Sequence, residues 1–136
     1  YQAGDDVKDI DWKATARHTE PLVRRYIAGR KHSVVLVFDS GVNMRAISPS
    51  GERKVDIGMM AAGILGYLAV RHTDSVSAYY GDTGGVHKTQ ARSSESHLER
   101  ILQTVLRATN TSQQNSSITA VLNDVHRTVR SRSILV

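Results

Sequence analysis

The stretch VVLVFDSGVNM, residues 34–44, decides the fold. Five apolar residues run into Asp39, and a short polar loop that contains a glycine follows. A short continuous apolar run is typical of a strand that is buried on both faces, as strands of parallel sheets are. In open α/β sheets, ligands bind beyond the carboxyl ends of such strands. Asp39 is therefore the first candidate for a functional residue.

The composition indicates one globular domain. A chain of 136 residues with 40% hydrophobic residues can bury a core of its own. It contains no cysteine, which excludes disulfides, thiolate metal ligands and cysteine nucleophiles. That absence, with no signal-peptide pattern at residues 1–13, favours a cytoplasmic location. Segment 55–70 is shorter than the ~20 apolar residues of a membrane span, so we expect a buried helix there and no membrane span.

The basic charge of the chain does not indicate nucleic-acid binding. Lysine and arginine number 18 against 13 acidic residues, which gives a formal net charge of +5. The basic residues are scattered along the sequence, and aromatic residues, which would stack on bases, make up only 5% of the chain. We therefore expect no nucleic acid among the partners.

From residue 33 onward, apolar strands alternate with amphipathic helices. This order predicts an α/β fold with a doubly wound, mostly parallel sheet flanked by helices. We expect strands at 33–39, 74–80 and 133–136, and an antiparallel edge strand after a hairpin turn, GDTGG, at 81–85. Helices should run from about 51–54 to 72, from near Ser94, and from a cap at Ser116 or Ser117.

Right-handed crossovers should bring two distant loops together. They place the last strand beside the first one, on the side opposite the second strand. The first strand then lies where the strand order reverses, which is where α/β folds form their binding crevice. We therefore expect the Asp39 loop and the polar loop around Ser116 to meet there.

The segment before the first strand carries a family signature. Residues 4–18 read GDDVKDIDWKATARH, a basic segment follows, and then comes the Asp39 strand. This combination resembles the bacterial Domain of Unknown Function 58 family, whose core is similar to a von Willebrand factor type A domain. The resemblance implies a family-specific segment at 1–32 and a partial type A-like domain at 33–136, truncated after its fourth core strand.

The resemblance also carries expectations about the whole protein. Members of the family are typically longer, with membrane-spanning segments before this portion and further strands and helices after it. The full-length protein would then be anchored at the inner face of the membrane. The family often occurs in operons with MoxR-type AAA+ ATPases, which implies such an ATPase as the partner and implies no enzymatic reaction.

Type A domains commonly hold a divalent metal in a metal-ion-dependent adhesion site, and the resemblance implies a degenerate version here. The first loop of that site reads D-x-S-x-S; Asp39 matches it, but Gly41 and Asn43 replace the serines. Ser116 stands where a second loop supplies a threonine. The implied metal ligands are thus Asp39, Asn43 and Ser116. The implied partner-binding residues are Ser40, Gly41, Asn115 and Ser117.

This ligand set is incomplete for a metal ion. Mg²⁺ requires nearly octahedral oxygen coordination, and one carboxylate, one amide and one hydroxyl supply little of it. The remaining acid of the type A pattern would follow residue 136. We therefore expect no cofactor in this chain, and Mg²⁺ only in a full-length protein that supplies the missing ligand.

The function we expect from these residues and the resemblance is a protein-interaction module with a degenerate metal site. Two other functions stay open beside it. One is a metal-independent structural scaffold. The other is a phosphoryl hydrolase with Asp39 as nucleophile, although Gly41 stands where such enzymes place their general acid. The sequence has no G-x-S-x-G elbow, no H-E-x-x-H and no P-loop lysine.

An open backbone edge at the last strand would also favour a homo-oligomer.

Overall fold

The computed structural model describes residues 31–136. The predicted segment 1–32 lies almost wholly outside the described residues, as does its GDDVKDIDWKATARH signature. The boundary predicted at residue 33 therefore stays a prediction.

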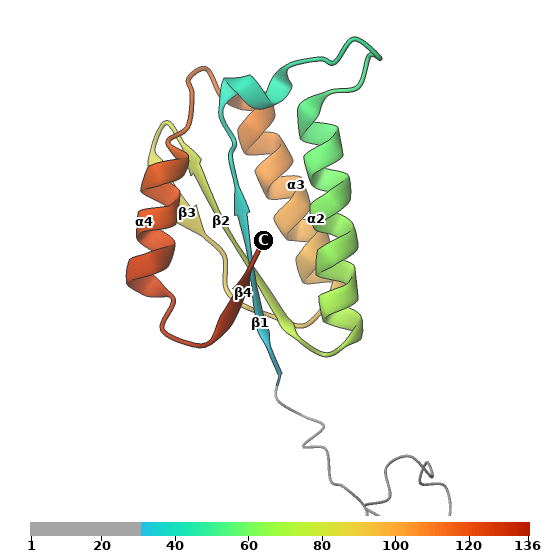
Figure 1. The fold of residues 1–136 in the computed structure, drawn as a ribbon, viewed down its shortest axis with the longest axis vertical. Coiled ribbons are helices and arrows are strands. Elements are labelled where there is room, and N and C mark those ends of the chain that lie inside the picture. The colour runs from blue at the N-terminus through green and yellow to red at the C-terminus, as the bar shows by residue number, and fades with distance from the viewer. Residues whose placement is uncertain (1–30) are drawn as a thin grey trace, which may run out of the picture. The chain divides into compact units, whose positions relative to one another are not determined.

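The described residues form a four-stranded mixed sheet with helices on both faces (Figure 1). The strand order is β3-β2-β1-β4. Strand β1 is parallel to both of its neighbours, whereas β3 is antiparallel to β2. The predicted α/β class is confirmed, and so is the position of the last strand beside the first. The strands are β1 (Ser33–Phe38), β2 (Ser75–Asp82), β3 (Gly85–Lys88) and β4 (Ser133–Leu135).

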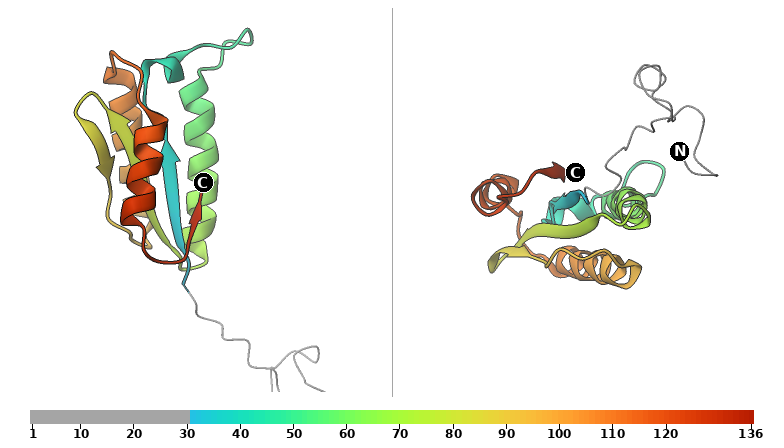
Figure 2. Two further views of the ribbon diagram at one scale, coloured as in Figure 1. Left: turned by 60° about the vertical axis from the view of Figure 1, so that its left-hand side comes forward. Right: turned by 90° about the horizontal axis from the view of Figure 1, so that it is seen from below.

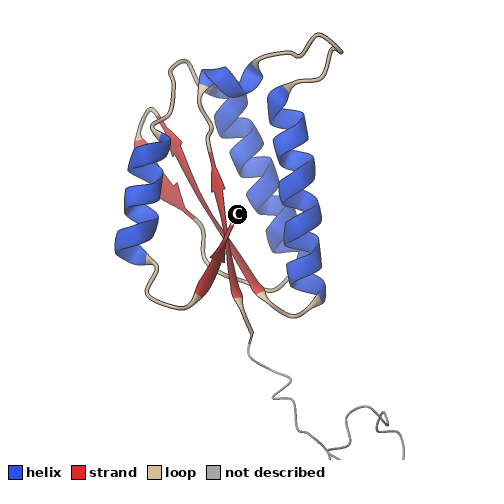
Figure 3. Ribbon diagram, in the orientation of Figure 1, coloured by secondary structure: helices blue, strands red, loops and turns tan. Residues whose placement is uncertain are grey.

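Two long helices cover one face of the sheet and a shorter helix covers the other (Figures 2 and 3). Ser94 caps α3 by accepting a hydrogen bond from the His97 amide at 3.3 Å. Ser117 caps α4 in the same way, with the Ala120 amide at 3.2 Å. The predicted cap at Ser116 or Ser117 is thus Ser117. The helical elements are η2 (Val42–Arg45), α2 (Lys54–Arg71), α3 (Glu95–Thr111) and α4 (Ile118–Thr128).

Strand β1 lies at the centre of the core because both of its faces are apolar. Val34, Leu36 and Phe38 pack against the α2 and α3 side, and Val35 packs with Val121 of α4. Burial of each such side chain stabilises the fold by about 1.5–3 kcal/mol. Successive side chains of β1 are thus buried on opposite faces of the sheet, which confirms the strand buried on both faces that the apolar run 34–38 predicted.

Helix α2 is not the buried helix that its apolar sequence predicted. Its buried residues are Val55, Ala62, Gly66 and Ala69, so small residues form most of the contact with the core. The opposite face is apolar but exposed, with Ile57, Met60, Ile64 and Leu68 all at least half accessible. Overall hydrophobicity did not distinguish these two faces. No helix in the described part of the chain is long and apolar enough to span a membrane.

The hairpin between β2 and β3 is tighter than predicted. Strand β2 continues through Gly81 to Asp82, and Asp82 pairs with Gly85. The turn is thus Thr83 and Gly84 alone, and it requires glycine at position 85, where φ is +119°. The strand extends into the GDTGG segment because Gly81 pairs with Val86 and Asp82 with Gly85. Gly81 is buried, and a Cβ atom there would lie 3.2 Å from the Val121 side chain.

Candidate functional site

Asp39 lies directly after β1, and its carboxylate joins two loops. Oδ1 accepts hydrogen bonds from the Gly41 amide at 2.9 Å and from the Ser116 hydroxyl. Oδ2 accepts one from the Asn43 side-chain amide at 2.9 Å. The prediction that the Asp39 loop and the Ser116 loop meet at the carboxyl end of β1 is therefore confirmed. We call Asp39, Gly41, Asn43 and Ser116 the Asp39 cluster.

The cluster favours the ionised form of Asp39. Partial burial by itself would raise the pKa of this carboxyl group. The hydrogen bonds from Ser116, Asn43 and Gly41, together with the positive charge of Lys54, outweigh burial and lower the pKa below its usual value. Asp39 is thus a carboxylate whose charge is matched by protein donors.

Further contacts fasten the same two loops. The Val42 amide donates to the Gln114 carbonyl oxygen at 3.1 Å. Arg45 donates to the carbonyl oxygens of Asn110 at 3.3 Å and Ser112 at 2.8 Å, at the carboxyl end of α3. A cation there also interacts favourably with the helix dipole. The loops after β1 and after α3 therefore form one continuous edge.

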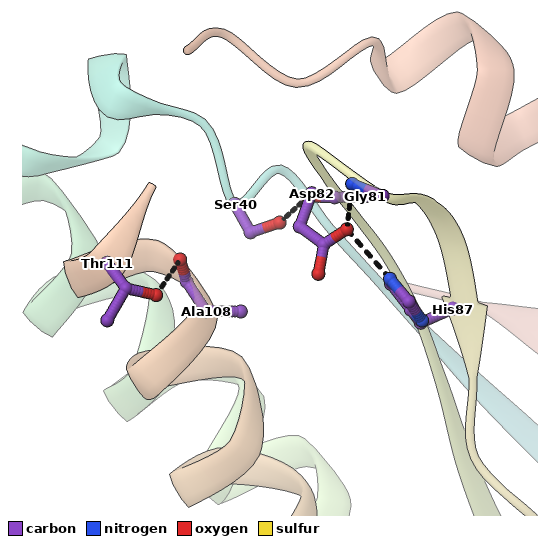
Figure 4. A network of polar contacts seen from close by, with 7 residues as sticks. Ser40, Gly81, Asp82, His87, Ala108 and Thr111 are labelled. Atoms are coloured by element: carbon purple, nitrogen blue, oxygen red, sulfur yellow. Dashed lines mark hydrogen bonds and ion pairs between the residues drawn. The ribbon is translucent and has the colours of Figure 1, made fainter. Parts of the chain in front are cut away.

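Ser40 and Gly41 do not face outward, which corrects their predicted role in partner binding. The Ser40 side chain is fully buried, and its hydroxyl donates to the Gly81 carbonyl oxygen of β2 (Figure 4). Gly41 is buried under the α3–α4 loop. The sequence of this polar loop does not show which of its residues are buried. Asn43, Asn115 and Ser117 are exposed.

The residues of the cluster do not fit a divalent metal site. A Cβ atom at position 41 would lie 2.5 Å from the Ser116 nitrogen and 2.7 Å from Asn43 Oδ1, so a serine ligand has no room there. Asn43 presents its donor nitrogen to Asp39, not its oxygen. The charge of Lys54 beside Asp39 also opposes a second cation. Both Asp39 carboxylate oxygens already accept hydrogen bonds from protein groups, and a metal ion would compete with these donors.

A second polar group lies on the neighbouring hairpin, and sequence reasoning missed it. Asp82 Oδ1 accepts a hydrogen bond from the Gly84 amide at 2.7 Å. The same oxygen lies 2.7 Å from His87 Nε2, and Figure 4 shows the Asp82 and His87 side chains pointing toward each other. The His87 ring stacks on Tyr80, with ring centroids 5.3 Å apart. Burial alone would raise the pKa of Asp82, but the bonds from His87 and Gly84 lower it. The sequence Asp82-Thr83-Gly84 was a usable signal, because aspartate two residues before glycine is typical of such turns.

Fold and site together define an α/β domain in which a polar cluster closes the sheet edge at the carboxyl end of β1. Residues 1–136 match the family described as "Protein of unknown function DUF58", and the chain belongs to that family. It is 30% identical over 105 residues to an uncharacterised protein of Mycobacterium bovis and to uncharacterised proteins of two Mycobacterium tuberculosis strains. The aligned region covers 77% of this chain but only 33% of each relative. No solved structure matches the chain.

Proposed function

We propose that the domain is a protein-interaction module and that its contact surface is the edge formed by the β1–η2 and α3–α4 loops. One observation carries the proposal. The hydrogen bond from Ser116 to Asp39 joins residues 77 positions apart, so two remote loops present a single surface. Exposed residues on this surface, Asn43, Asn115 and Ser117, offer neutral hydrogen-bonding groups to a partner.

The contact would be independent of metal. The Asp39 carboxylate is engaged by three protein donors, and Gly41 leaves no space for a further ligand. The von Willebrand factor type A resemblance supports the choice of this edge as the binding face, and the cluster would replace the metal of that fold as the element that holds the edge together.

The role we propose is binding and not catalysis. An aspartate nucleophile needs a free carboxylate oxygen and a nearby general acid. Asp39 instead accepts hydrogen bonds on both oxygens, and position 41 is a glycine. The phosphoryl-hydrolase alternative therefore has little support from the contacts of Asp39.

The partner we propose is a MoxR-type AAA+ ATPase. The support for this partner is the family resemblance, since members of the family often occur in operons with such ATPases. The chain spans about one third of the length of the curated relatives it matches, so other parts of a longer protein could take part in the contact.

The test is a binding titration with a MoxR-type ATPase of the same organism, in Mg²⁺ and in EDTA. We expect Asn115→Arg to abolish binding, because it places a bulky charge on the edge without touching the side chains of the Asp39 cluster. The matched control is Asn123→Arg on the exposed face of α4, which should bind as the unmodified chain does. EDTA should have no effect.

Other outcomes would contradict the proposal in distinct ways. Loss of binding in EDTA would show that a metal bridges the contact. Binding that survives both Asn115→Arg and Asp39→Ala would show that this edge is inert, as in a structural scaffold.

A further inference from the structure

The lower part of the sheet, at the amino end of β1, carries serines where a parallel sheet usually has apolar residues. The register pairs Ser33 of β1 with both Ser75 and Ser133. Two residues further along each strand, on the same face of the sheet, Ser77 pairs with Val35. Paired residues of parallel strands point to the same face, so Ser33, Ser77 and Ser133 share the face that α4 covers. Ser77 is buried on a strand with neighbours on both sides.

Helix α4 leaves this hydroxyl-bearing floor open. A cavity of about 360 Å³ lies over it, within the size range of small-molecule sites. Val35, Tyr79 and Val129 supply apolar walls, and the Tyr79 hydroxyl lies 2.9 Å from that of Thr128. The cavity therefore combines apolar walls with a few polar groups, as ligand sites typically do.

Two cationic side chains, Lys88 at the end of β3 and Arg130 after α4, line the cavity, and no carboxylate lines it. Within residues 31–136, neither side chain forms an ion pair or a hydrogen bond. Both charges are thus available to an anion on the same rim.

Two hydroxyl groups on the floor are available as well. Ser133 and Ser131 bond to each other, and the Thr89 hydroxyl accepts from the Ala78 amide. The Ser33 and Ser77 hydroxyls have no hydrogen-bond partner among the described residues. Every fully buried side-chain polar atom of those residues does have a partner, so these two hydroxyls are not fully buried. Ser33 and Ser77 therefore reach the open space of the cavity.

We propose that this cavity binds a small phosphate ester. The phosphate would pair with Arg130 and Lys88, and a hydroxyl-bearing body would lie over Ser33 and Ser77 against the apolar walls. Guanidinium and ammonium groups both suit phosphate oxygens, and the pair is stronger where water is partly excluded. The site lies at the opposite end of β1 from the Asp39 cluster, so it is independent of the function proposed above.

The test uses glycerol 3-phosphate, inorganic phosphate and glycerol as probes in an amide chemical-shift titration. We expect saturable shifts with glycerol 3-phosphate at millimolar concentrations, weaker shifts with phosphate and none with glycerol. The shifts should centre on residues 33, 77, 88 and 130. Lys88→Gln and Arg130→Gln should each weaken binding by about fivefold, the upper end for one exposed ion pair.

Arg132→Gln is the matched control, because Arg132 belongs to the same connection between α4 and β4 but does not line the cavity. It should leave the binding of glycerol 3-phosphate unchanged. Ser77→Ala should weaken the binding of glycerol 3-phosphate more than the binding of inorganic phosphate. The proposal is overturned if the ester gives no saturable shifts, if glycerol binds equally well, or if Arg132→Gln weakens binding as much as Arg130→Gln does.

Discussion

At the scale of single residues, Asp39 joins the two loops at the carboxyl end of β1. Sequence reasoning placed this carboxylate at the end of a buried strand and paired it with Ser116, and both positions are confirmed. What it could not provide was the direction of the neighbouring side chains. Ser40 and Asn43 are both polar, yet Ser40 is buried and donates its hydroxyl to Gly81 of β2, whereas Asn43 is exposed and bonded to Asp39.

Removing the charge of Asp39 should reduce stability in a pH-dependent way. Its pKa is lower in the folded chain than in the unfolded chain, so its contribution is full above pH ~4 and is lost as pH falls through the folded-state pKa. We expect Asp39→Asn to lower the free energy of unfolding at pH 7 by about 1 kcal/mol, a modest value because the group is partly solvated. Urea unfolding at pH 7 and at pH 3 measures this.

The difference between Asp39→Asn and the unmodified chain should shrink at the lower pH. Asp56→Asn serves as the control, since Asp56 forms an exposed ion pair with Arg53 that should contribute little. An Asp39→Asn variant as stable as the parent at pH 7 would show that the cluster does not hold the loops.

Gly41→Ser would restore the serine of the type A pattern, but we expect it to fail as a metal ligand. The new Cβ would meet the backbone nitrogen of Ser116 at 2.5 Å, so the two loops would have to separate. We predict a loss of about 1–3 kcal/mol in the free energy of unfolding, as for overpacked sites. Addition of Mg²⁺ should not recover it, whereas recovery by Mg²⁺ would show that the loops can open to form a metal site.

At the scale of elements, periodicity predicted the helices and strands well because most carry a one-sided pattern. In the apolar stripe of α3, Leu98, Ile101 and Val105 are buried as expected, and Leu102 and Leu106 are partly buried. Helix α2 differed because it is apolar on both sides, so its sequence does not show which side packs. The end of β2 was also missed, because a turn-like composition concealed a strand that continues to Asp82.

Two glycines of α2 should respond in opposite ways to the same substitution. A Cβ at Gly58 would lie 3.7 Å from Met44, an ordinary contact, so Gly58→Ala should stabilise the domain by about 0.5–1 kcal/mol through helix propensity. A Cβ at Gly66 would lie 2.5 Å from Leu98, a buried residue of α3. Gly66→Ala should therefore destabilise it by about 1–3 kcal/mol.

Thermal unfolding of the two variants beside the parent chain is sufficient to compare them. Equal and positive shifts in Tm would mean that α2 and α3 do not pack as closely at Gly66 as the structure has them.

At the scale of the whole molecule, one side of the domain is apolar and uncovered. Ile134 pairs with Val34 of β1, and the Val136 backbone bonds to Val35 and Val37. Both side chains are about half exposed, and Val136 lines a groove together with Leu65 of α2. The exposed face of α2 continues this surface. The outer edge of β4 has no neighbouring strand among the described residues, and an exposed apolar edge strand tends to pair with another chain.

We predict that residues 1–136 self-associate through this edge, β4 against β4 of a second copy. A two-fold pair would also bring the apolar faces of the two α2 helices toward each other. Light scattering and sedimentation should give a dimer that Ile134→Lys converts to a monomer. Ile47→Lys is the control, since Ile47 is 67% exposed but lies on the loop before α2. A monomer at every concentration, or a dimer insensitive to Ile134→Lys, would contradict the prediction.

The central claim is that protein donors and not a metal hold the two loops at Asp39. The most direct test is calorimetric titration of the chain with Mg²⁺ and Mn²⁺, with the unfolding midpoint measured in excess metal and in EDTA. We predict no saturable heat that Asp39→Ala removes, and the same unfolding midpoint in metal and in EDTA. Saturable binding that Asp39→Ala abolishes, with a raised midpoint in metal, would contradict it.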